Sequence, residues 1–181
     1  MFILKKQKQE ETWLKPRHKI VRDLVACAIG PYSAWKYGVK AEKFKEQNGR
    51  QYLILFNHRT GYDQFFVGAS FDGPIYYLAT EDIFPIGWVS SLIRYLVAPI
   101  PIKKQTSDIR AIKNCLRVAK EGGTIALAPE GNRTYSGKTE FMLPTIAFLA
   151  KKLGLPIALY RIEGGYGVHP RWSDVVRKGS M

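Results

Sequence analysis

The sequence predicts one α/β domain: a mixed, largely buried central sheet flanked by helices, with a basic amphipathic helix before it. Three observations lead to this prediction. From residue 51 onward, short apolar runs alternate with segments whose apolar residues recur at helical spacing. The length of 181 residues suits one domain of ordinary size. The hydrophobic content of 46% and charged content of 24% resemble those of soluble globular proteins, which excludes wholesale disorder.

The individual elements follow from the same alternation. We expect strands at 51–56, 74–79, 99–102, 124–128 and 155–160, and helices at 62–70, 83–97, 106–120 and 143–153. Thr106, Ser107 or Asp108 can cap the third of these helices, and Gly122-Gly123 can end it. Continuous apolar strands that alternate with helices favour a buried and partly parallel sheet. In such sheets the chemistry collects where strands end and loops begin.

The net charge is the unusual feature of the composition. The chain has 28 Lys plus Arg against 15 Asp plus Glu, a formal charge of +13. Residues 1–50 hold 12 basic and 5 acidic side chains, so more than half of the excess lies there. A balance this basic indicates a polyanionic partner, which can be nucleic acid, an anionic membrane surface or a phosphorylated substrate.

We expect two parts, a basic amphipathic segment at 1–45 that docks on a membrane surface and a catalytic domain at 46–181. In the first part, Trp13 and Leu14 stand beside basic residues, and apolar residues recur at helical spacing through Ala28. Two interpretations stay open at this point. The helix packs on the domain, or it lies in a membrane interface with basic residues on anionic headgroups and Trp and Leu in the acyl boundary.

Several other classes are not expected. No run reaches 18 uninterrupted apolar residues, so no transmembrane helix is predicted, and the start does not resemble a signal peptide. Cys27 and Cys115 lie 88 positions apart in apolar surroundings, which favours two buried thiols and a reducing, cytosolic compartment. His18, His58 and His169 are too scattered to indicate zinc, so no metal site is expected.

The first candidate site follows the first strand directly, in the sequence NHRTGYD at 57–63. A tight turn at Gly61 and a helix that begins near Asp63 can bring the Asp63 carboxylate back to the His58 imidazole. A carboxylate on one imidazole nitrogen fixes the tautomer and leaves the other nitrogen to accept a proton. The alternative is a loop histidine beside an aspartate that caps a helix.

The second candidate site follows the fourth strand, in the sequence APEGNRT at 128–134. Arg133 and the backbone amides of such a turn can bind a phosphate or carboxylate, although a solvated surface arginine is the simpler alternative. Gly131 and the later Gly137-Lys138-Thr139 imitate a phosphate-binding loop, but five residues separate the glycines where that motif has four. An NTPase is therefore excluded.

Both motifs together, in this order and about seventy residues apart, resemble those of the glycerolipid acyltransferase family, typified by 1-acyl-sn-glycerol-3-phosphate acyltransferase. The resemblance covers about residues 50–162. Two weaker blocks agree with it, one at 98–104 with an apolar strand that ends in basic residues, the other at 155–159 with a proline-containing strand. The resemblance implies the α/β fold of the glycerol-3-phosphate acyltransferases.

It also implies a site and a reaction. His58 would act as general base on an acceptor hydroxyl and Asp63 would orient it, with direct attack on the thioester of acyl-CoA or acyl carrier protein and no metal or other cofactor. The implied substrate-binding residues are Glu130, Gly131, Asn132, Arg133, Lys103 and Lys104. The acceptor would be a lysophospholipid, foremost 1-acyl-sn-glycerol-3-phosphate, which gives phosphatidate. The family usually has Thr at Asn132 and Arg near Lys103 and Lys104; Lys keeps the charge but lacks the bidentate fork.

The implied setting is peripheral, on the cytoplasmic side of an anionic membrane. Trp13, Trp35, Phe84 and Trp88 are candidate membrane contacts, or else core residues. Three alternatives remain: the same chemistry on glycerol-3-phosphate, an ornithine lipid or another lysolipid; a non-catalytic basic membrane-binding domain; and a nucleic-acid-binding domain, for which no RNP-like, zinc-finger or helix-turn-helix motif is present. Family members commonly continue with a further strand and helix after the matched region, so a truncated chain and a minimal member both stay open.

Overall fold

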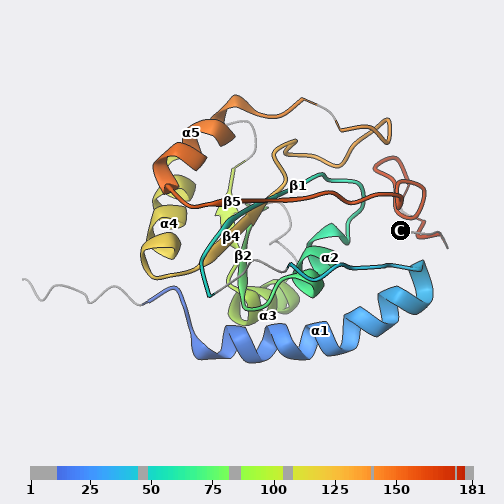
Figure 1. Cartoon of the computed structure of the whole chain (residues 1–181), viewed down its shortest axis with the longest axis horizontal. Helices are drawn as coiled ribbons and strands as arrows, with labels where there is room; N and C mark the ends of the chain where they lie inside the picture. Colours follow the sequence, from blue (N-terminus) through green and yellow to red (C-terminus); the bar gives the residue numbers. More distant parts are fainter. Residues whose placement is uncertain are drawn as a thin grey trace, which may run out of the picture.

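A five-stranded sheet lies between two layers of helices in the computed structural model, which describes residues 12–44, 49–81, 87–103, 108–139, 141–173 and 175–177 (Figure 1). The elements are α1 (Pro16–Tyr37), β1 (Leu53–Phe56), α2 (Asp63–Ser70), β2 (Ile75–Thr80), α3 (Gly87–Val97), β3 (Ile100–Ile102), α4 (Ile109–Lys120), β4 (Thr124–Leu127), α5 (Pro144–Leu153) and β5 (Ile157–Tyr160). Every predicted strand and helix is present in the predicted order. The α/β fold class is confirmed.

The strands run in the order β3-β2-β4-β1-β5, and each hydrogen-bonded pair is parallel. The sequence predicted a mixed sheet, whereas no antiparallel pair occurs among the described strands. The reason lies in the connections, because each strand after β1 is reached through a helix, and a helical crossover returns the chain in the same direction. All five strands consequently end at one edge of the sheet.

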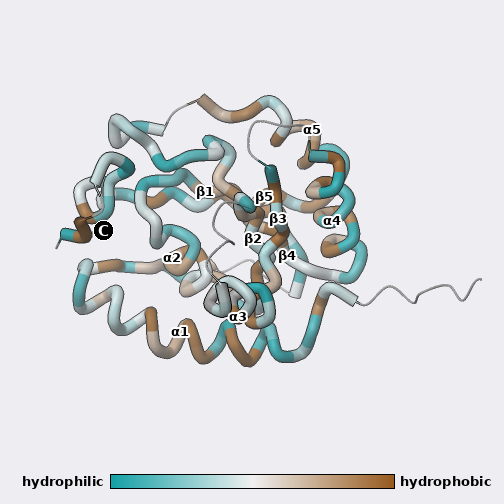
Figure 2. Tube along the Cα trace, turned by 180° about the vertical axis from the view of Figure 1, so that it is seen from behind, coloured by the Kyte–Doolittle hydropathy of each residue, from teal (hydrophilic) through white to brown (hydrophobic). Residues whose placement is uncertain are grey.

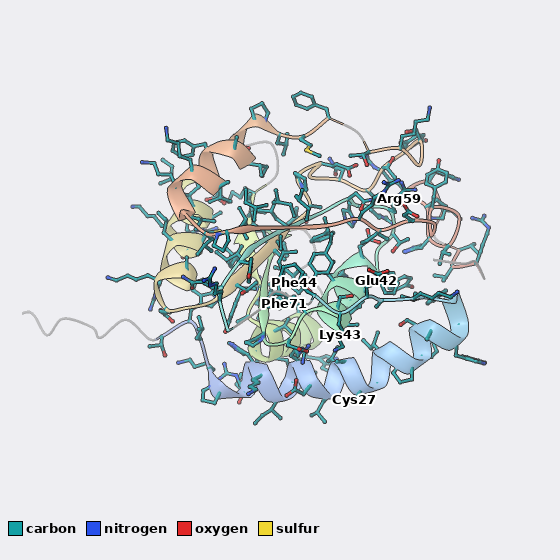
Figure 3. All side chains as sticks on the ribbon, viewed as in Figure 1. Cys27, Glu42, Lys43, Phe44, Arg59 and Phe71 are labelled. Carbon is teal, nitrogen blue, oxygen red and sulfur yellow. The ribbon has the colours of Figure 1, made fainter. Side chains whose placement is uncertain are left out.

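The two faces of the sheet have separate cores, since neighbouring strand residues point to opposite faces. Leu53 and Ile125 pack with Cys115, Val118 and Leu149 under α4 and α5. On the other face, Ile54, Phe56 and Ala126 pack with Val67 of α2 and with Phe71. Phe44, which precedes β1, covers this second core and stacks on Phe71 with ring centroids 6.1 Å apart (Figure 3).

Strand β5 is an edge of the sheet and is only half covered. Its register pairs Leu53 with Ile157 and Leu55 with Leu159, so these side chains share the face that α4 and α5 cover elsewhere. Ala158 points to the other face and is buried, but Ile157 is 51% exposed and Leu159 is 78% exposed. Apolar side chains therefore lie uncovered beside an open strand edge.

Helix α4 begins at one of its three predicted caps. The Asp108 carboxylate accepts hydrogen bonds from the amides of Ala111 and Lys103, both at 3.0 Å. The first bond satisfies an amide of the first helical turn, and the second ties the end of β3 to the helix. Thr106 and Ser107, the other candidates, lie outside the described residues.

Helix α1 packs against α2 and α3, on the far side of the sheet from α4 and α5 (Figure 1). Its predicted apolar residues divide between two faces, because Val21 and Val25 point inward while Ile20 and Leu24 are exposed. Trp35 is also exposed, at 80%. The apolar stretches recur along α1 in Figure 2. The inward-pointing residues thus favour the interpretation that the helix packs on the domain, and the exposed residues favour the interpretation that it lies in a membrane interface.

Trp13 packs against the core, which is one of the two alternatives that the sequence left open for it. Its indole N–H donates to the carbonyl of Ala98 at 3.1 Å, and the amides of Trp13 and Leu14 donate to the Glu121 carboxylate at 2.7 and 3.0 Å. Both side chains pack against the core beneath α4. They anchor the chain before α1, and are not free to enter a bilayer.

The cysteines correct a second prediction. Cys115 is buried, and burial raises the pKa of its thiol to about 12. Cys27 was expected to be buried too, but it is exposed on α1, because this helix leaves part of its apolar surface uncovered (Figure 3). Both are free thiols.

Candidate active site

The two loops that carry the sequence motifs lie side by side at the carboxyl edge of the sheet. Strands β1 and β4 are neighbours, yet the chain leaves β1 for β2 on one side and leaves β4 for β5 on the other. Such a reversal opens a crevice at the ends of the strands, where open α/β sheets bind their ligands. Arg59, labelled in Figure 3, belongs to the first of these loops.

In the loop after β1, His58 contacts Asp63 through a short hydrogen bond. The distance from His58 Nδ1 to Asp63 Oδ2 is 2.8 Å. Asp63 is the first residue of α2, and the intervening turn returns the chain so that its carboxylate faces the imidazole. Asp63 is fully buried, whereas the His58 side chain keeps 24% of its exposure. Asp63 is therefore shielded from solvent, whereas His58 is accessible.

Three further donors fix the Asp63 carboxylate. The amides of Arg59 and Thr60 donate to Oδ2 at 2.6 and 2.9 Å, and the Thr60 hydroxyl donates to Oδ1 at 2.9 Å. A carboxylate that receives four donors serves as an acceptor only, so we assign the proton between it and His58 to the imidazole Nδ1. His58 Nε2 is then left with its lone pair available for a proton.

The loop after β4 is tied to the first loop by its backbone. The amide of His58 donates to the Glu130 carboxylate at 3.2 Å, and the amide of Thr134 donates to the carbonyl of His58 at 2.8 Å. Gly131 turns the chain with a φ of +70°, which favours glycine. These contacts place the second loop directly beside the His58–Asp63 pair.

Glu130 has a different place from the one predicted. The sequence predicted a substrate-binding role, but its side chain is buried against the first loop and is not among the residues that line the cavity. A buried carboxylate that accepts a backbone amide has the geometry of a support for His58. The structure thus separates Glu130 from its neighbours Gly131, Asn132 and Arg133.

A cavity of about 870 Å³ opens in front of these loops. His58, Gly131, Asn132 and Arg133 line one part of it. The remaining wall is largely apolar and is made by α1, α2 and β2, with contributions from α3 and α5. Lys103 does not line this cavity, since it is exposed at the end of β3, and Lys104 lies outside the described residues.

The sequence analysis missed four residues that hold the site loops or line the cavity. Thr60 holds Asp63, and Asn57 exchanges two hydrogen bonds with the backbone of Ile162, at 2.9 and 2.7 Å. His169 and Arg171 line the cavity from the C-terminal part of the chain. Thr60 and Asn57 could have been found, because both lie inside the first motif. His169 and Arg171 follow no periodic pattern that would have indicated them.

Within the described residues, no group of three or more His, Cys, Asp or Glu side chains could hold a metal ion. None of the described helices has both the length and the apolar character needed to cross a membrane.

A parallel α/β sheet that carries a carboxylate-held histidine and an arginine beside one cavity at its carboxyl edge has the arrangement of an enzyme active site. The comparison with protein families identifies the family to which the chain belongs. The family model described as "Acyltransferase" matches residues 39–162, and the chain belongs to this family.

Two individual proteins are similar to this chain. One is the chloroplastic 1-acyl-sn-glycerol-3-phosphate acyltransferase BAT2 of Brassica napus, 26% identical over 89 residues, which are 49% of this chain and 25% of that protein. The other is the crystal structure of the 1-acyl-sn-glycerophosphate (LPA) acyltransferase PlsC of Thermotoga maritima. It superposes with a TM-score of 0.73 at 22% identity, over 90% of this chain and 66% of that one. The chain therefore spans a quarter of the first protein's length and just under two thirds of the second's.

Proposed function

We propose that this chain transfers a fatty acyl group from acyl-CoA or acyl carrier protein to the free hydroxyl of a lysophospholipid. The proposed acceptor is 1-acyl-sn-glycerol-3-phosphate and the product is phosphatidate. The observation that carries the proposal is the His58–Asp63 pair, which opens on a cavity that also holds Arg133, in a chain of the acyltransferase family.

The chemistry follows from the free nitrogen of His58. As the acceptor oxygen attacks the thioester carbonyl carbon, Nε2 takes the hydroxyl proton, and Asp63 stabilises the imidazolium that results. The tetrahedral intermediate then collapses, the carbon–sulfur bond breaks, and the imidazolium returns the proton to the leaving thiolate. One ester bond replaces one thioester bond, and no acyl-enzyme forms.

Arg133 is the proposed ligand of the acceptor's phosphate. Its guanidinium lines the same cavity as His58 and lies on the loop whose backbone bonds to the His58 backbone. A guanidinium binds phosphate with two parallel hydrogen bonds, which fixes orientation as well as position. The acceptor hydroxyl would thereby be presented to Nε2.

The apolar part of the cavity is the proposed place for an acyl chain. Its wall along α1 runs from His18 to Gly30, which is about 18 Å at the rise of an α-helix. Burial of a methylene group is worth about 0.8 kcal/mol, so a chain along this wall would contribute much of the substrate binding.

Membrane association at the cytoplasmic face is proposed on the outer surface of the molecule. Ile20, Leu24 and Trp35 of α1 are exposed, as is Trp88 of α3, at 77%. Exposed tryptophan and aliphatic side chains on a basic protein are suited to the boundary between headgroups and acyl chains of an anionic bilayer. Phe84, another predicted contact, lies outside the described residues.

The decisive experiment is acyl transfer by the purified chain with labelled acyl-CoA or acyl carrier protein and a panel of acceptors. The panel contains 1-acyl-sn-glycerol-3-phosphate, glycerol-3-phosphate, a lyso-ornithine lipid and a lysolipid without phosphate monoester. We expect turnover with the first, and a loss of at least about 10²–10⁴-fold in His58→Ala. Lys113→Ala, an exposed change on α4, is the matched control and should keep wild-type turnover.

Two results would overturn the proposal. Near-wild-type turnover of folded His58→Ala would remove the general base. Preference for another acceptor of the panel would show that 1-acyl-sn-glycerol-3-phosphate is not the substrate. Flotation with anionic vesicles, beside a gel-shift with nucleic acid, tests the membrane role; binding to nucleic acid alone would reject it.

A further inference from the structure

Residues 163–173, which we call the C-terminal segment, lie just beyond the part of the chain that the family model matches. The segment has no helix or strand, yet Val168 in its middle is almost completely buried. The Tyr166 hydroxyl donates to the carbonyl of Tyr135 at 2.5 Å, and the Tyr166 ring stands edge-on to Trp172 with centroids 4.9 Å apart. The segment is thus fastened to the loop that carries Arg133.

His169 is the residue of this segment that reaches both site loops. Arg133 Nη1 donates to the carbonyl oxygen of His169 at 3.2 Å and lies 3.5 Å from His169 Nδ1. The imidazole stacks on Tyr62, with centroids 5.5 Å apart and an interplanar angle of 30°. A Cβ atom added at Gly61 would come within 3.0 Å of His169 Nδ1, so the first loop closes tightly on the same ring.

These contacts restrain an otherwise flexible side chain. An arginine side chain has large rotamer entropy, which binding must offset unless the orientation is already set. His169 occupies Nη1, while Nη2 and Nε form no hydrogen bond with any described residue. Two N–H donors of the fork are therefore left for a ligand. Arg171, two residues further on, lines the same cavity and brings a second positive charge.

We propose that His169 is a positioning residue that orients Arg133 toward the anionic headgroup of the acceptor, and that Arg171 is a second ligand of the same headgroup. This inference rests on the proposed function for its ligand, a phosphate monoester. Selection of a phosphorylated acceptor then depends on the C-terminal segment as well as on the loop after β4.

The test uses the full chain with three variants of His169. His169→Ala removes both the ring and the nitrogen. His169→Phe keeps the stack on Tyr62 and removes the nitrogen, and His169→Asn keeps an acceptor near the position of Nδ1 and removes the stack. With 1-acyl-sn-glycerol-3-phosphate as acceptor, we expect His169→Ala to raise the acceptor KM by about tenfold, the equivalent of one hydrogen bond, and to change kcat less than twofold.

Two further readouts separate positioning from a merely structural effect. In the Arg133→Ala background, His169→Ala should raise the KM no further, because the His169 side chain acts on the acceptor only through Arg133. Partial recovery in His169→Phe or His169→Asn shows which contact matters. For the second arginine, Arg171→Gln should raise the same KM several-fold, whereas Arg161→Gln, a matched exposed arginine paired with Glu163, should not.

Direct titration of the chain with glycerol-3-phosphate, without acyl donor, measures the headgroup site independently of turnover. Wild-type binding that His169→Ala weakens supports the inference even if no acyl transfer occurs, and then only the proposed function fails. Equal KM and equal affinity in wild type and His169→Ala would overturn it, as would additive effects of His169→Ala and Arg133→Ala. Absence of binding to the wild-type chain would overturn it as well.

Discussion

The two loops at the carboxyl edge of the sheet reach their functional geometry in different ways. In the loop after β1 the hold on Asp63 is self-contained, because the amides, the hydroxyl and the imidazole that bind its carboxylate all come from residues 58–60. The loop after β4 depends on distant parts of the chain, since Arg133 is held by His169, 36 positions away. The comparison teaches that the His58–Asp63 pair is fixed by local sequence, while the orientation of Arg133 is fixed by tertiary contacts.

The first prediction tests the self-contained loop and has the largest expected effect. In Asp63→Asn the amide N–H₂ of the new side chain can replace an acceptor, which would turn the imidazole to the wrong tautomer and remove the lone pair from Nε2. We expect kcat to fall by about 10²–10⁴-fold with little change in the acceptor KM. Single-turnover acyl transfer measures this, with circular dichroism to show that the fold is kept. A KM effect alone would contradict the assignment.

The second prediction tests the loop that depends on distant contacts. Arg133→Ala should raise the acceptor KM by about 10–100-fold, because charge-assisted hydrogen bonds to phosphate are lost, and should affect kcat far less. Arg133→Lys keeps the charge without the fork, so its acceptor KM should lie between that of the wild type and that of Arg133→Ala. Steady-state kinetics with and without a phosphate on the acceptor measures the difference. An equal loss with both acceptors would rule out a phosphate ligand.

The third prediction compares two buried threonines with the same architecture. Thr60 Oγ1 donates to Asp63 and accepts from the Tyr62 amide, and Thr134 Oγ1 donates to the carbonyl of Lys138 and accepts from the Gly137 amide. Thr60→Val and Thr134→Val should each lower the free energy of unfolding by about 1–3 kcal/mol, since buried polar groups lose their partners.

Their kinetic effects should differ. Thr60→Val disturbs the Asp63 carboxylate and should lower kcat, whereas Thr134→Val disturbs the loop of Arg133 and should raise the acceptor KM. Thr→Ser at each position keeps the hydroxyl and is the matched control. Denaturant unfolding and steady-state kinetics give both quantities, and identical kinetic patterns in the two Val variants would break the comparison.

The fourth and smallest prediction concerns His18 at the start of α1, outside both loops. Burial, with the nearby charges of Arg17 and Lys15, lowers the pKa of His18 below 6.5. Its Nδ1 lies 3.0 Å from the Tyr76 hydroxyl and accepts from the Lys15 amide. As the pH falls below about 6.5, the unfolded chain takes up a proton that the folded chain resists, so the free energy of unfolding decreases.

His18→Asn keeps an acceptor for the Lys15 amide but cannot titrate. The stability difference between wild type and His18→Asn, followed from pH 7.5 to 5, should therefore shrink toward low pH. A constant difference would mean that His18 is not responsible. Residues common to both proteins contribute equally, so their contributions cancel in this difference.

The sequence predicted most of the fold, for physical reasons that particular residues show. The strand at Leu53–Phe56 is a continuous apolar run because both of its faces are buried, and α4 has its predicted aspartate cap. Prediction from the sequence fails where the role of a residue depends on partners that are distant in the chain. Nothing near Trp13 indicates that it would bind Ala98 and Glu121, and nothing near His169 indicates that it would meet Arg133.

The same division holds for the candidate site. The approach of His58 to Asp63 could be anticipated because a short turn at Gly61 connects them. The orientation of Glu130 could not, since the motif shows which residues are present but not which way each side chain faces. The exposure of Cys27 was missed for a related reason: helical periodicity identifies an apolar face, but does not show whether another element covers it.

The uncovered face of β5 has a consequence for the behaviour of the protein at high concentration. Ile157 and Leu159 place aliphatic side chains at a sheet edge whose outward backbone groups pair with no other described strand. A strand edge of this kind is a template for pairing between molecules, and natural proteins usually protect it with charge. Intermolecular strand addition at this edge is the expected route of aggregation, and Leu159→Lys is the gatekeeper substitution that should suppress it while leaving the opposite, buried face of the strand intact.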